Sequence, residues 1–441
     1  MQSKMLVHIQ VIAFVLAFIS QQHVALASLV VPVTKHTDAA VNPLYSAHAY
    51  LDKAQYPSPL ISTPAYWNEW RYIQQSLLID LDAPFSWHYS FPRQEGCQEC
   101  RQTVTCTEFQ CTDLRTTSSY QSPLCPPPTN TSMYDIYMDC ETCPVNVISP
   151  VTGECSQVIP TYDQFMFTRS NGGAVISYDP HITYPIAGST PPWTFDPFPS
   201  DVLGVMALSS SPYALPAYLG EVDHVIALCL PSNVSAGPGV LLFGYGPYYL
   251  GPQREVDVRS LLSYTELLKH PNSFGYFIGV NAIVIKKQSI IVPNNATTKI
   301  STLEPYTKLR TDIYNGVVRR VSKVTKRIPP AKSVAPFGLC FNTTVNGTTV
   351  GIKVPNIDLA LQDGKKWTIS TANSIKQVTE DVACLAVVDN GPTSEHAIVI
   401  GTYQFEDNLL VFDLITSTLG FSSSLLRNQT SCSNFDFAVN H

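Results

Sequence analysis

The stretch Leu77-Leu78-Ile79-Asp80-Leu81-Asp82-Ala83-Pro84-Phe85-Ser86-Trp87 organises the rest of the chain. Its apolar run, Leu77 to Ile79, predicts a buried strand, because a short continuous hydrophobic run bounded by turn residues is typical of one. Asp80 lies at the end of this strand, where a tight turn begins, and the large ring of Trp87 follows seven residues later. Asp80 is therefore the first candidate functional group of the chain.

The second half of the chain repeats this arrangement. Lys299-Ile300-Ser301-Thr302 is again a strand that meets a turn, and Ile398-Val399-Ile400-Gly401 repeats the hydrophobic-hydrophobic-Gly form of Val202-Leu203-Gly204. Each half therefore pairs a strand and turn with a later apolar strand. By this repeat, Ser301 occupies the position that Asp80 has in the first half.

Hydrophobic patterning elsewhere predicts a mainly β protein with a few short helices. We expect helices at residues 214–219 and 305–321, and strands at 29–33, 203–208, 224–230, 240–244, 277–285, 289–292, 409–414 and 419–421. Residues 61–75 have no clear period. A Gly-, Pro- and Tyr-rich segment, 246–252, predicts the junction between an N-terminal lobe, 28–252, and a C-terminal lobe, 253–441.

The N-terminus has the pattern of a signal peptide spanning residues 1–27. Lys4 supplies positive charge, an apolar stretch covers 11–19, and Ala25-Leu26-Ala27 is a small-x-small cleavage site. A membrane anchor would need about 20 apolar residues, and this run is shorter. We therefore expect a secreted, extracellular protein.

Twelve cysteines follow this segment, and an even number in an oxidising compartment predicts disulfides. Residues 91–157 form a Cys-rich insert, which we expect to be a loop-heavy surface stapled by disulfides rather than a second core. Two CxxC pairs resemble zinc motifs, but they lie farther apart than the about 15–20 residues of common zinc ribbons, so we expect no metal. The pairing stays open from sequence. The cysteines are Cys97, Cys100, Cys106, Cys111, Cys125, Cys140, Cys143, Cys155, Cys229, Cys340, Cys384 and Cys432.

Composition and sequons limit the classes of partner. A net charge of −7 argues against nucleic acid or an anionic membrane as a partner, and we expect a monomer. Asn-x-Ser/Thr sequons predict a glycoprotein. The sequons are at Asn130, Asn233, Asn295, Asn342, Asn346 and Asn428.

From residue 29 to the C-terminus the chain resembles plant secreted pepsin-fold proteins, a group that includes xylanase inhibitors, xyloglucan-specific endoglucanase inhibitors and extracellular dermal glycoproteins. The most specific matches are Val31-Pro32-Val33-Thr34-Lys35, Lys299-Ile300-Ser301-Thr302, the segment 333–341 (SVAPFGLCF) and the segment 406–413 (EDNLLVFD). The resemblance implies an all-β, bilobal pepsin-like fold. Residues 61–75 look inserted relative to this group.

The resemblance also identifies Asp80 as the first catalytic Asp of the pepsin fold, whereas Ser301 stands where the second would be. Aspartic proteases need two close carboxylates that share a proton, and the pKa of a hydroxyl is too high to replace one. Asp82 lies in the same lobe as Asp80, so we expect it to satisfy backbone N–H groups of its own turn. Glu304 is another carboxylate near the second turn, but it lies three residues after the position that corresponds to Asp80. The sequence thus predicts an inactive protease homologue without a cofactor.

For such a protein the resemblance implies an inhibitor of microbial cell-wall glycoside hydrolases, acting in plant defence in the apoplast or cell wall. Those enzymes keep two carboxylates in an open cleft, which a protruding His or Arg can hydrogen-bond. In this chain the corresponding loop, 389–397, ends in Glu395-His396, and His396 is the candidate residue to enter the cleft. Two alternatives stay open: an aspartic endopeptidase, and a wall or storage glycoprotein without a hydrolase target.

Overall fold

The computed structural model of the protein describes residues 28–38, 43–52, 72–90, 102–117, 125, 142–220, 224–251, 257–294, 296–345, 348–349 and 352–438. The predicted signal peptide and most of the predicted insertion, 61–75, lie outside these residues. So do Cys97, Cys100, Cys140, Asn130, Asn295 and Asn346. Within the described part, no helix combines the length and the apolar character needed to cross a bilayer.

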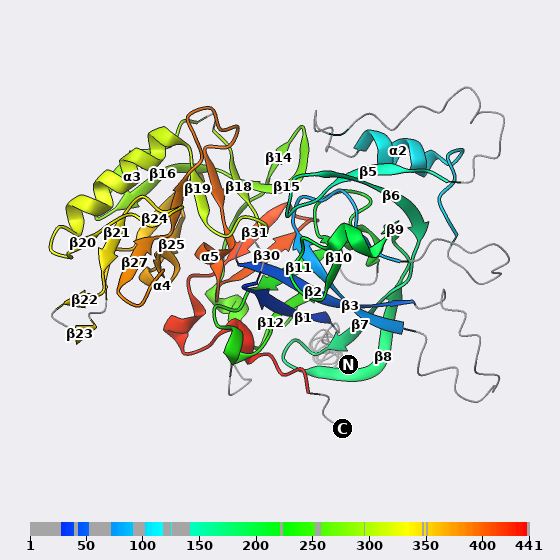
Figure 1. The fold of residues 1–441 in the computed structure, drawn as a ribbon. Helices are drawn as coiled ribbons and strands as arrows, with labels where there is room; N and C mark the ends of the chain where they lie inside the picture. Colours follow the sequence, from blue (N-terminus) through cyan, green and yellow to red (C-terminus); the bar gives the residue numbers. More distant parts are fainter. Residues whose placement is uncertain are drawn as a thin grey trace, which may run out of the picture.

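The expected fold class is confirmed, since strands dominate and form two halves side by side (Figure 1). Residues 72–80, which include the predicted strand before Asp80, pair on both sides within one 15-stranded sheet. In spatial order its strands are β13 (Ser263–Glu266), β31 (Thr418–Phe421), β30 (Leu409–Asp413), β11 (Val225–Cys229), β12 (Gly239–Phe243), β1 (Ser28–His36), β7 (Phe165–Ser170), β2 (Leu44–Asp52), β3 (Tyr72–Asp80), β10 (Val202–Ala207), β4 (Trp87–Tyr89), β9 (Ile186–Thr190), β6 (Cys155–Tyr162) and β5 (Val145–Ile148), with β8 (Val175–Thr183) on β7.

The second half of the chain forms smaller sheets. The six-stranded one contains β14 (Leu268–His270), β15 (Ser273–Ile278), β18 (Thr298–Ile300), β29 (Ile398–Ile400), β19 (Thr307–Leu309) and β28 (Val387–Asp389). One four-stranded sheet contains β17 (Gln288–Ile291), β16 (Val280–Ile285), β24 (Ile357–Leu361) and β25 (Lys366–Ile369). A second contains β20 (Pro330–Ala331), β21 (Cys340–Asn342), β27 (Val382–Leu385) and β26 (Ile375–Gln377). The hairpin of β22 (Thr344–Val345) and β23 (Thr348–Thr349) completes the set.

The described helices are short apart from one on the outside of the second half (Figure 1). The α-helices are α2 (Phe109–Thr117), α3 (Thr311–Val324), α4 (Thr371–Ser374) and α5 (Thr402–Phe405). The 3-10 helices are η1 (Pro192–Phe195), η2 (Leu215–Tyr218), η3 (Val234–Ala236), η4 (Val258–Leu261), η5 (Leu425–Asn428) and η6 (Cys432–Asn434).

Two helix predictions need correction. The predicted helix 305–321 begins only at Thr311, because Thr307–Leu309 forms β19 and pairs with β28 and β29. Thr307 and Leu309 are buried with Lys308 half-buried between them, which is the alternation of a strand. The predicted helix 214–219 is the single 3-10 turn η2. In addition, residues 72–75 of the predicted insertion lie in β3 and pair with β2.

The 15-stranded sheet contains strands from both halves of the chain. Strands β13, β30 and β31 come from after residue 252, yet they join the 15-stranded sheet through the pairing of β30 with β11. A buried ion pair also links the halves: the Lys35 ammonium on β1 lies 2.9 Å from the Glu406 carboxylate just after α5. The Tyr45 hydroxyl donates a 2.6 Å hydrogen bond to the same carboxylate.

The described part of the Cys-rich insert contributes side chains to a hydrophobic cluster that it shares with the rest of the first half. Val104, Leu114 and Val145 are buried in one hydrophobic cluster with Trp87. Here α2 packs near β5, and alternate residues of β5 point inward. The insert therefore extends the hydrophobic core around Trp87.

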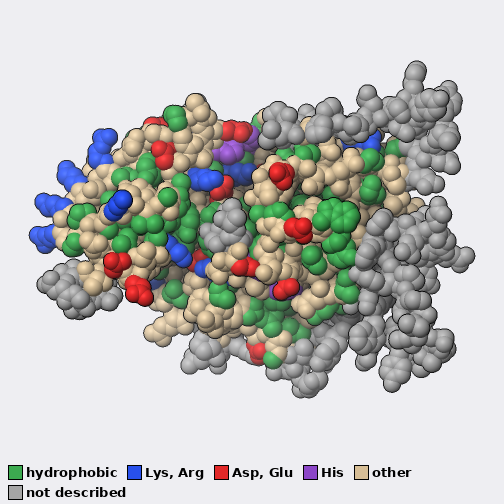
Figure 2. All heavy atoms as spheres, viewed as in Figure 1, with side chains coloured by type: hydrophobic (Ala, Val, Ile, Leu, Met, Phe, Trp, Pro, Cys, Tyr) green, Lys and Arg blue, Asp and Glu red, His purple; other side chains and the backbone are tan. Residues whose placement is uncertain are grey.

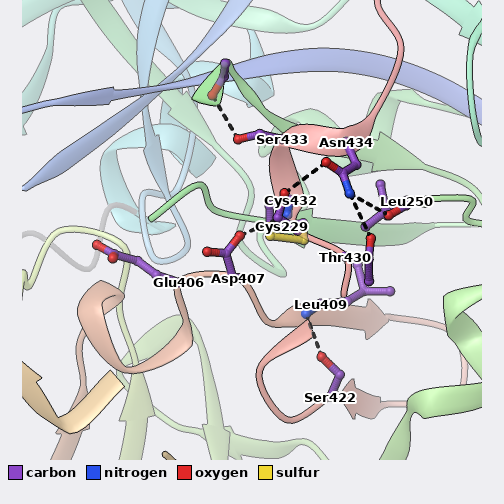
Figure 3. Close-up of a disulfide and its surroundings, with 12 residues drawn as sticks. Cys229, Leu250, Glu406, Asp407, Leu409, Ser422, Thr430, Cys432, Ser433 and Asn434 are labelled. Carbon is purple, nitrogen blue, oxygen red and sulfur yellow. Dashed lines mark hydrogen bonds between the residues drawn. A yellow bond between two sulfur atoms is a disulfide. The ribbon is translucent and has the colours of Figure 1, made fainter. Parts of the chain in front are cut away.

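Disulfides are present as predicted. They join Cys111 to Cys143, Cys125 to Cys155, Cys229 to Cys432 and Cys340 to Cys384, and Cys106 is disulfide-bonded as well. The Cys229–Cys432 bridge ties η6 to β11 across 203 residues of sequence (Figure 3). Beside it, the Asp407 carboxylate accepts a 2.9 Å hydrogen bond from the Cys432 N–H. The C-terminal segment is therefore fixed to the first half.

Candidate functional site

Asp80 ends β3 and is almost completely buried, with 3% of its surface exposed. Its strand runs parallel to β10, and Ala207 lies opposite Asp80 in the register. One carboxylate oxygen accepts a 2.8 Å hydrogen bond from the Asp82 N–H. Burial, followed by the negative charge of Asp82, raises the pKa of Asp80 to about 6, because both disfavour the ionised form.

Ser301 follows β18 in the corresponding place. Its strand runs parallel to β29, as β3 does to β10, and Ile300 lies opposite Ile400. The Ser301 hydroxyl oxygen accepts hydrogen bonds from the N–H groups of Leu303 (3.2 Å) and Glu304 (3.3 Å). Asp80 and Ser301 therefore have the same local role, since each accepts the N–H two residues ahead in its own turn.

The turns that carry these two residues touch across the halves of the molecule. Thr302, which is 1% exposed, donates its hydroxyl to the carbonyl oxygen of Ile79 at 2.6 Å. The residue after Ser301 thus binds the residue before Asp80. The structure thereby brings the two sequence-predicted turns together.

Asp82 corrects the sequence prediction. Its carboxylate does not cap its own turn but binds the Lys299 ammonium and the Ser273 hydroxyl, both from the second half. Burial opposes ionisation of Asp82, but the charge and hydrogen bond of Lys299 outweigh it and hold the pKa below its usual value. Asp82 is therefore a charged link between the halves rather than a partner for Asp80.

The space beside Asp80 is very small. A cavity of about 10 Å³ is lined by Asp80, Phe85 and Trp87 and by Val147 and Ile148 at the end of β5. Roughly one water molecule needs that much room. The other residues that line this cavity are apolar, and they include part of the Cys-rich insert.

The loop between β28 and β29 carries the other sequence-predicted residues. It is braced internally: the Asn390 amide donates to the Ser394 hydroxyl at 2.6 Å, and that hydroxyl donates to the His396 carbonyl oxygen at 2.8 Å. The Glu395 side chain is 70% exposed. His396 is half-buried, so it lies on the wall of the loop rather than at its tip.

His396 packs against residues of the neighbouring strands. Its Nδ1 lies 2.8 Å from the Thr297 hydroxyl, and its ring centroid lies 5.4 Å from Phe277 and 5.7 Å from His270. Burial, followed by the positive charge of Lys299, lowers the pKa of His396. Figure 2 shows histidine and acidic side chains together near the middle of the upper edge. Sequence reasoning missed His270, because nothing in Lys269-His270-Pro271 points to a loop more than 120 residues away.

A large cavity adjoins this region. Its volume is about 840 Å³, and it is lined mainly by the hairpin of β14 and β15, including His270, Ser273 and Phe274, with Ser210 from the first half. Hydrogen bonds from both the N–H and the hydroxyl of Ser210 to the Phe274 carbonyl oxygen close one side. The cavity lies next to the loop 389–397 and is separate from the small cavity beside Asp80.

The described sequons differ in accessibility. Asn233 and Asn428 are exposed, at the start of η3 and the end of η5. Asn342 is half-buried in β21, and its amide nitrogen donates a 3.0 Å hydrogen bond to the Pro330 carbonyl oxygen. The structure therefore offers two open acceptor sites.

Family models match both halves of the chain. The xylanase inhibitor N-terminal model matches residues 72–245, and the xylanase inhibitor C-terminal model matches residues 275–423. The chain belongs to the xylanase-inhibitor family. These two matches contain Asp80 and Ser301 respectively, so the repeat predicted from sequence coincides with the two parts of the family.

Relatives of the family carry several different names. "Chitinase CLP" of Oryza sativa subsp. japonica is 33% identical over 82% of this chain and 86% of its own length. "Gamma conglutin 1" of Prunus dulcis is 36% identical over 67% and 70%. "Probable aspartic proteinase GIP2" of Nicotiana benthamiana is 40% identical, but the match spans 57% of this chain and 62% of that relative.

Solved structures agree with the fold. The crystal structure of edgp superposes with a TM-score of 0.74 at 29% identity, over 93% of this chain and 98% of that one. Conglutin gamma from lupine seeds gives a TM-score of 0.71 at 26% identity, over 94% and 99%. Both likenesses extend over nearly the whole chain, so the resemblance stated from sequence is confirmed.

Proposed function

We propose that this protein is a secreted, catalytically inactive pepsin-fold glycoprotein that inhibits microbial cell-wall glycoside hydrolases, namely xylanases or xyloglucan endoglucanases, in plant defence. The observation that carries the proposal is the place of Ser301. Its turn contacts the turn of Asp80 through the Thr302–Ile79 hydrogen bond, which supports the assignment of Ser301 to the second catalytic position, where a hydroxyl would stand instead of a carboxylate.

Peptide hydrolysis by this fold requires a shared proton between two carboxylates. Asp80 has no such partner in this proposal, because Asp82 is held by Lys299 and Ser273 and the Ser301 oxygen accepts backbone N–H groups. Asp80 also faces a cavity of only about 10 Å³. Each of these features argues against a peptide bond being gripped and hydrolysed beside Asp80.

The loop 389–397 supports the inhibitory part of the proposal. A hydrolase cleft contains two carboxylates, and an imidazole is a suitable hydrogen-bond donor to them. The Nδ1 of His396 is taken by Thr297, while no described residue hydrogen-bonds its Nε2. Because the loop is braced by Asn390 and Ser394, it would present this nitrogen at little entropic cost.

The test compares three proteins as inhibitors of microbial xylanases and xyloglucan endoglucanases, with reducing-sugar release as the readout. We expect inhibition by the wild type and inhibition weakened at least about tenfold by His396→Ala. The matched control is His224→Asn, which removes another half-buried histidine at a left-handed position (φ 46°) that Asn tolerates. Equal potency of His396→Ala would discard the loop assignment, and absence of inhibition by the wild type would overturn the function.

A second candidate rests on the names of relatives. Gamma conglutin of Prunus dulcis and Lupinus albus, and basic 7S globulin of Glycine max, match this chain. A wall or storage glycoprotein without a hydrolase target is therefore the alternative. A wild-type protein that neither inhibits a hydrolase of the panel nor cleaves denatured casein at acid pH would favour it.

A further inference from the structure

We propose that His270, Glu395 and His396 form a binding site for a divalent transition-metal ion, with zinc as the ion that fits best. Each residue offers one ligand atom, and these atoms all lie within 4.8 Å of one another. The residues come from two segments more than 120 residues apart, the end of β14 and the loop before β29.

The donor set matches the chemistry of zinc. Two imidazole nitrogens and one carboxylate oxygen are a common protein set for this ion, with a remaining position for water. At zinc bond lengths near 2.1 Å, tetrahedral ligand atoms lie roughly 3.4 Å apart. The His270 Nε2 and the Glu395 Oε1 are already 3.8 Å apart. The Glu395 side chain is exposed, so it can shorten its own distance to the His270 Nε2 without moving the core.

The two rings are already held in place. His270 stacks on Phe277, with ring centroids 4.9 Å apart and planes inclined by 23°. The hydrogen bond of His396 Nδ1 to Thr297 is the kind of outer contact that orients a ligating imidazole and leaves its other nitrogen for the metal.

The charge around the cluster favours a cation. Lys299 is the nearby positive group, but its ammonium is paired with the Asp82 carboxylate. The unpaired charge at the cluster is therefore the negative charge of Glu395. The adjacent cavity of about 840 Å³, which His270 also lines, gives an ion a route to the ligands.

One consequence rests on the proposed function. The hydrogen bond of His396 Nδ1 to Thr297 leaves Nε2 for a ligand, so a bound ion would occupy the nitrogen that we assign to the hydrolase carboxylates. Zinc should then weaken inhibition, and chelation should restore it.

The binding test uses the full secreted chain alone, so it does not depend on any hydrolase. The protein is stripped with a chelator, dialysed and titrated with zinc chloride at pH 7.0 in a calorimeter. We expect about one equivalent to bind, with affinity reduced at least about tenfold by His270→Ala and by His396→Ala, and several-fold by Glu395→Gln. His224→Asn and Glu380→Gln remove a histidine and an exposed glutamate elsewhere and should leave the affinity unchanged.

Thermal unfolding without metal checks that the variants fold, and the exposed Glu395→Gln variant tests the site with little risk to the fold. Cobalt(II) gives a second readout, because its visible absorption reports ligand number, and His270→Ala should change that spectrum. No saturable zinc binding by the wild type below about 1 mM would overturn the site. Equal zinc affinity in the wild type and all three site variants would overturn it as well.

Discussion

Thr302 in the second half of the protein donates its hydroxyl to the carbonyl oxygen of Ile79 in the first half, at 2.6 Å. The bond joins the turn after β3, which begins at Asp80, to the turn after β18, which begins at Ser301. In the function we propose, these are the two catalytic turns of the pepsin fold, and the second one lacks its carboxylate. We interpret this contact as a structural link between the two halves that does not depend on proteolytic activity.

The Thr302→Val substitution should destabilise the protein by about 1–3 kcal/mol, because it leaves the buried Ile79 carbonyl without its donor. The measurement is the free energy of unfolding from denaturant titration. Thr116→Val is the control, because Thr116 is exposed on α2, and it should change stability by less than about 0.5 kcal/mol. If Thr302→Val were as stable as the wild type, the Thr302–Ile79 hydrogen bond would not be a stabilising link between the halves.

The Asp80→Asn substitution should stabilise the protein at neutral pH. The pKa of Asp80 is about 6 when folded and 3.8 when unfolded, so the unfolded chain releases its proton first as pH rises. The contribution of Asp80 to stability is thus full below pH 3.8 and is lost as pH rises to about 6. This difference corresponds to on the order of 3 kcal/mol.

The check is the unfolding free energy of wild type and Asp80→Asn at pH 4 and pH 7.5. The amide keeps an oxygen that can accept the Asp82 N–H, so the gain should appear at pH 7.5 and nearly vanish at pH 4. Asp381→Asn, which alters an exposed carboxylate, should show no such gain. A less stable Asp80→Asn at pH 7.5 would show that the ionised carboxylate is required.

The Ser301→Asp substitution should not create a protease. A second carboxylate would be present, but Val147 and Ile148 would still line the cavity of about 10 Å³ beside Asp80. We expect neither the wild type nor the variant to cleave denatured casein at acid pH in a pepstatin-sensitive way. Pepstatin-sensitive cleavage by the wild type would refute the inactive assignment. Cleavage by the variant alone would show that Ser301 is the whole cause of inactivity.

Among the described sequons, Asn233 and Asn428 should carry glycans in the secreted protein, and Asn342 should not. The first two side chains are exposed, whereas Asn342 is half-buried in β21 and its amide nitrogen donates to the Pro330 carbonyl oxygen of the neighbouring strand β20. Glycopeptide mass spectrometry before and after enzymatic deglycosylation measures the occupancy of each site. High occupancy at Asn342 would mean that this edge of the sheet is accessible when the glycan is added.

The sequence predicted the strand before Asp80 because Leu77–Ile79 is a continuous apolar run that ends at turn residues, and it predicted the strand before Ser301 from the repeat of the first half. It did not predict the role of Asp82, because its partners Lys299 and Ser273 are about 200 residues away and only the closed fold brings them near. A local rule assigned Asp82 to its own turn, and a cross-half ion pair overrode that rule.

Two other differences between the sequence prediction and the structure also arise from contacts between distant segments. The helix expected from residue 305 begins at Thr311, because pairing with β28 and β29 captures Thr307–Leu309 as a strand. The cluster of His270 with Glu395 and His396 was also invisible in sequence, since a single histidine in a hairpin has no pattern. Contacts between distant segments decide both features, and hydrophobic periodicity does not contain them.

The most direct test of the account is a titration of a microbial xylanase and a xyloglucan endoglucanase, each at nanomolar concentration, with the purified secreted protein. The account predicts that reducing-sugar release by one of the two enzymes falls linearly and approaches zero near one molecule of protein per molecule of enzyme. Undiminished activity of both enzymes at about a hundredfold excess would contradict it, since a nanomolar inhibitor would then occupy almost every active site.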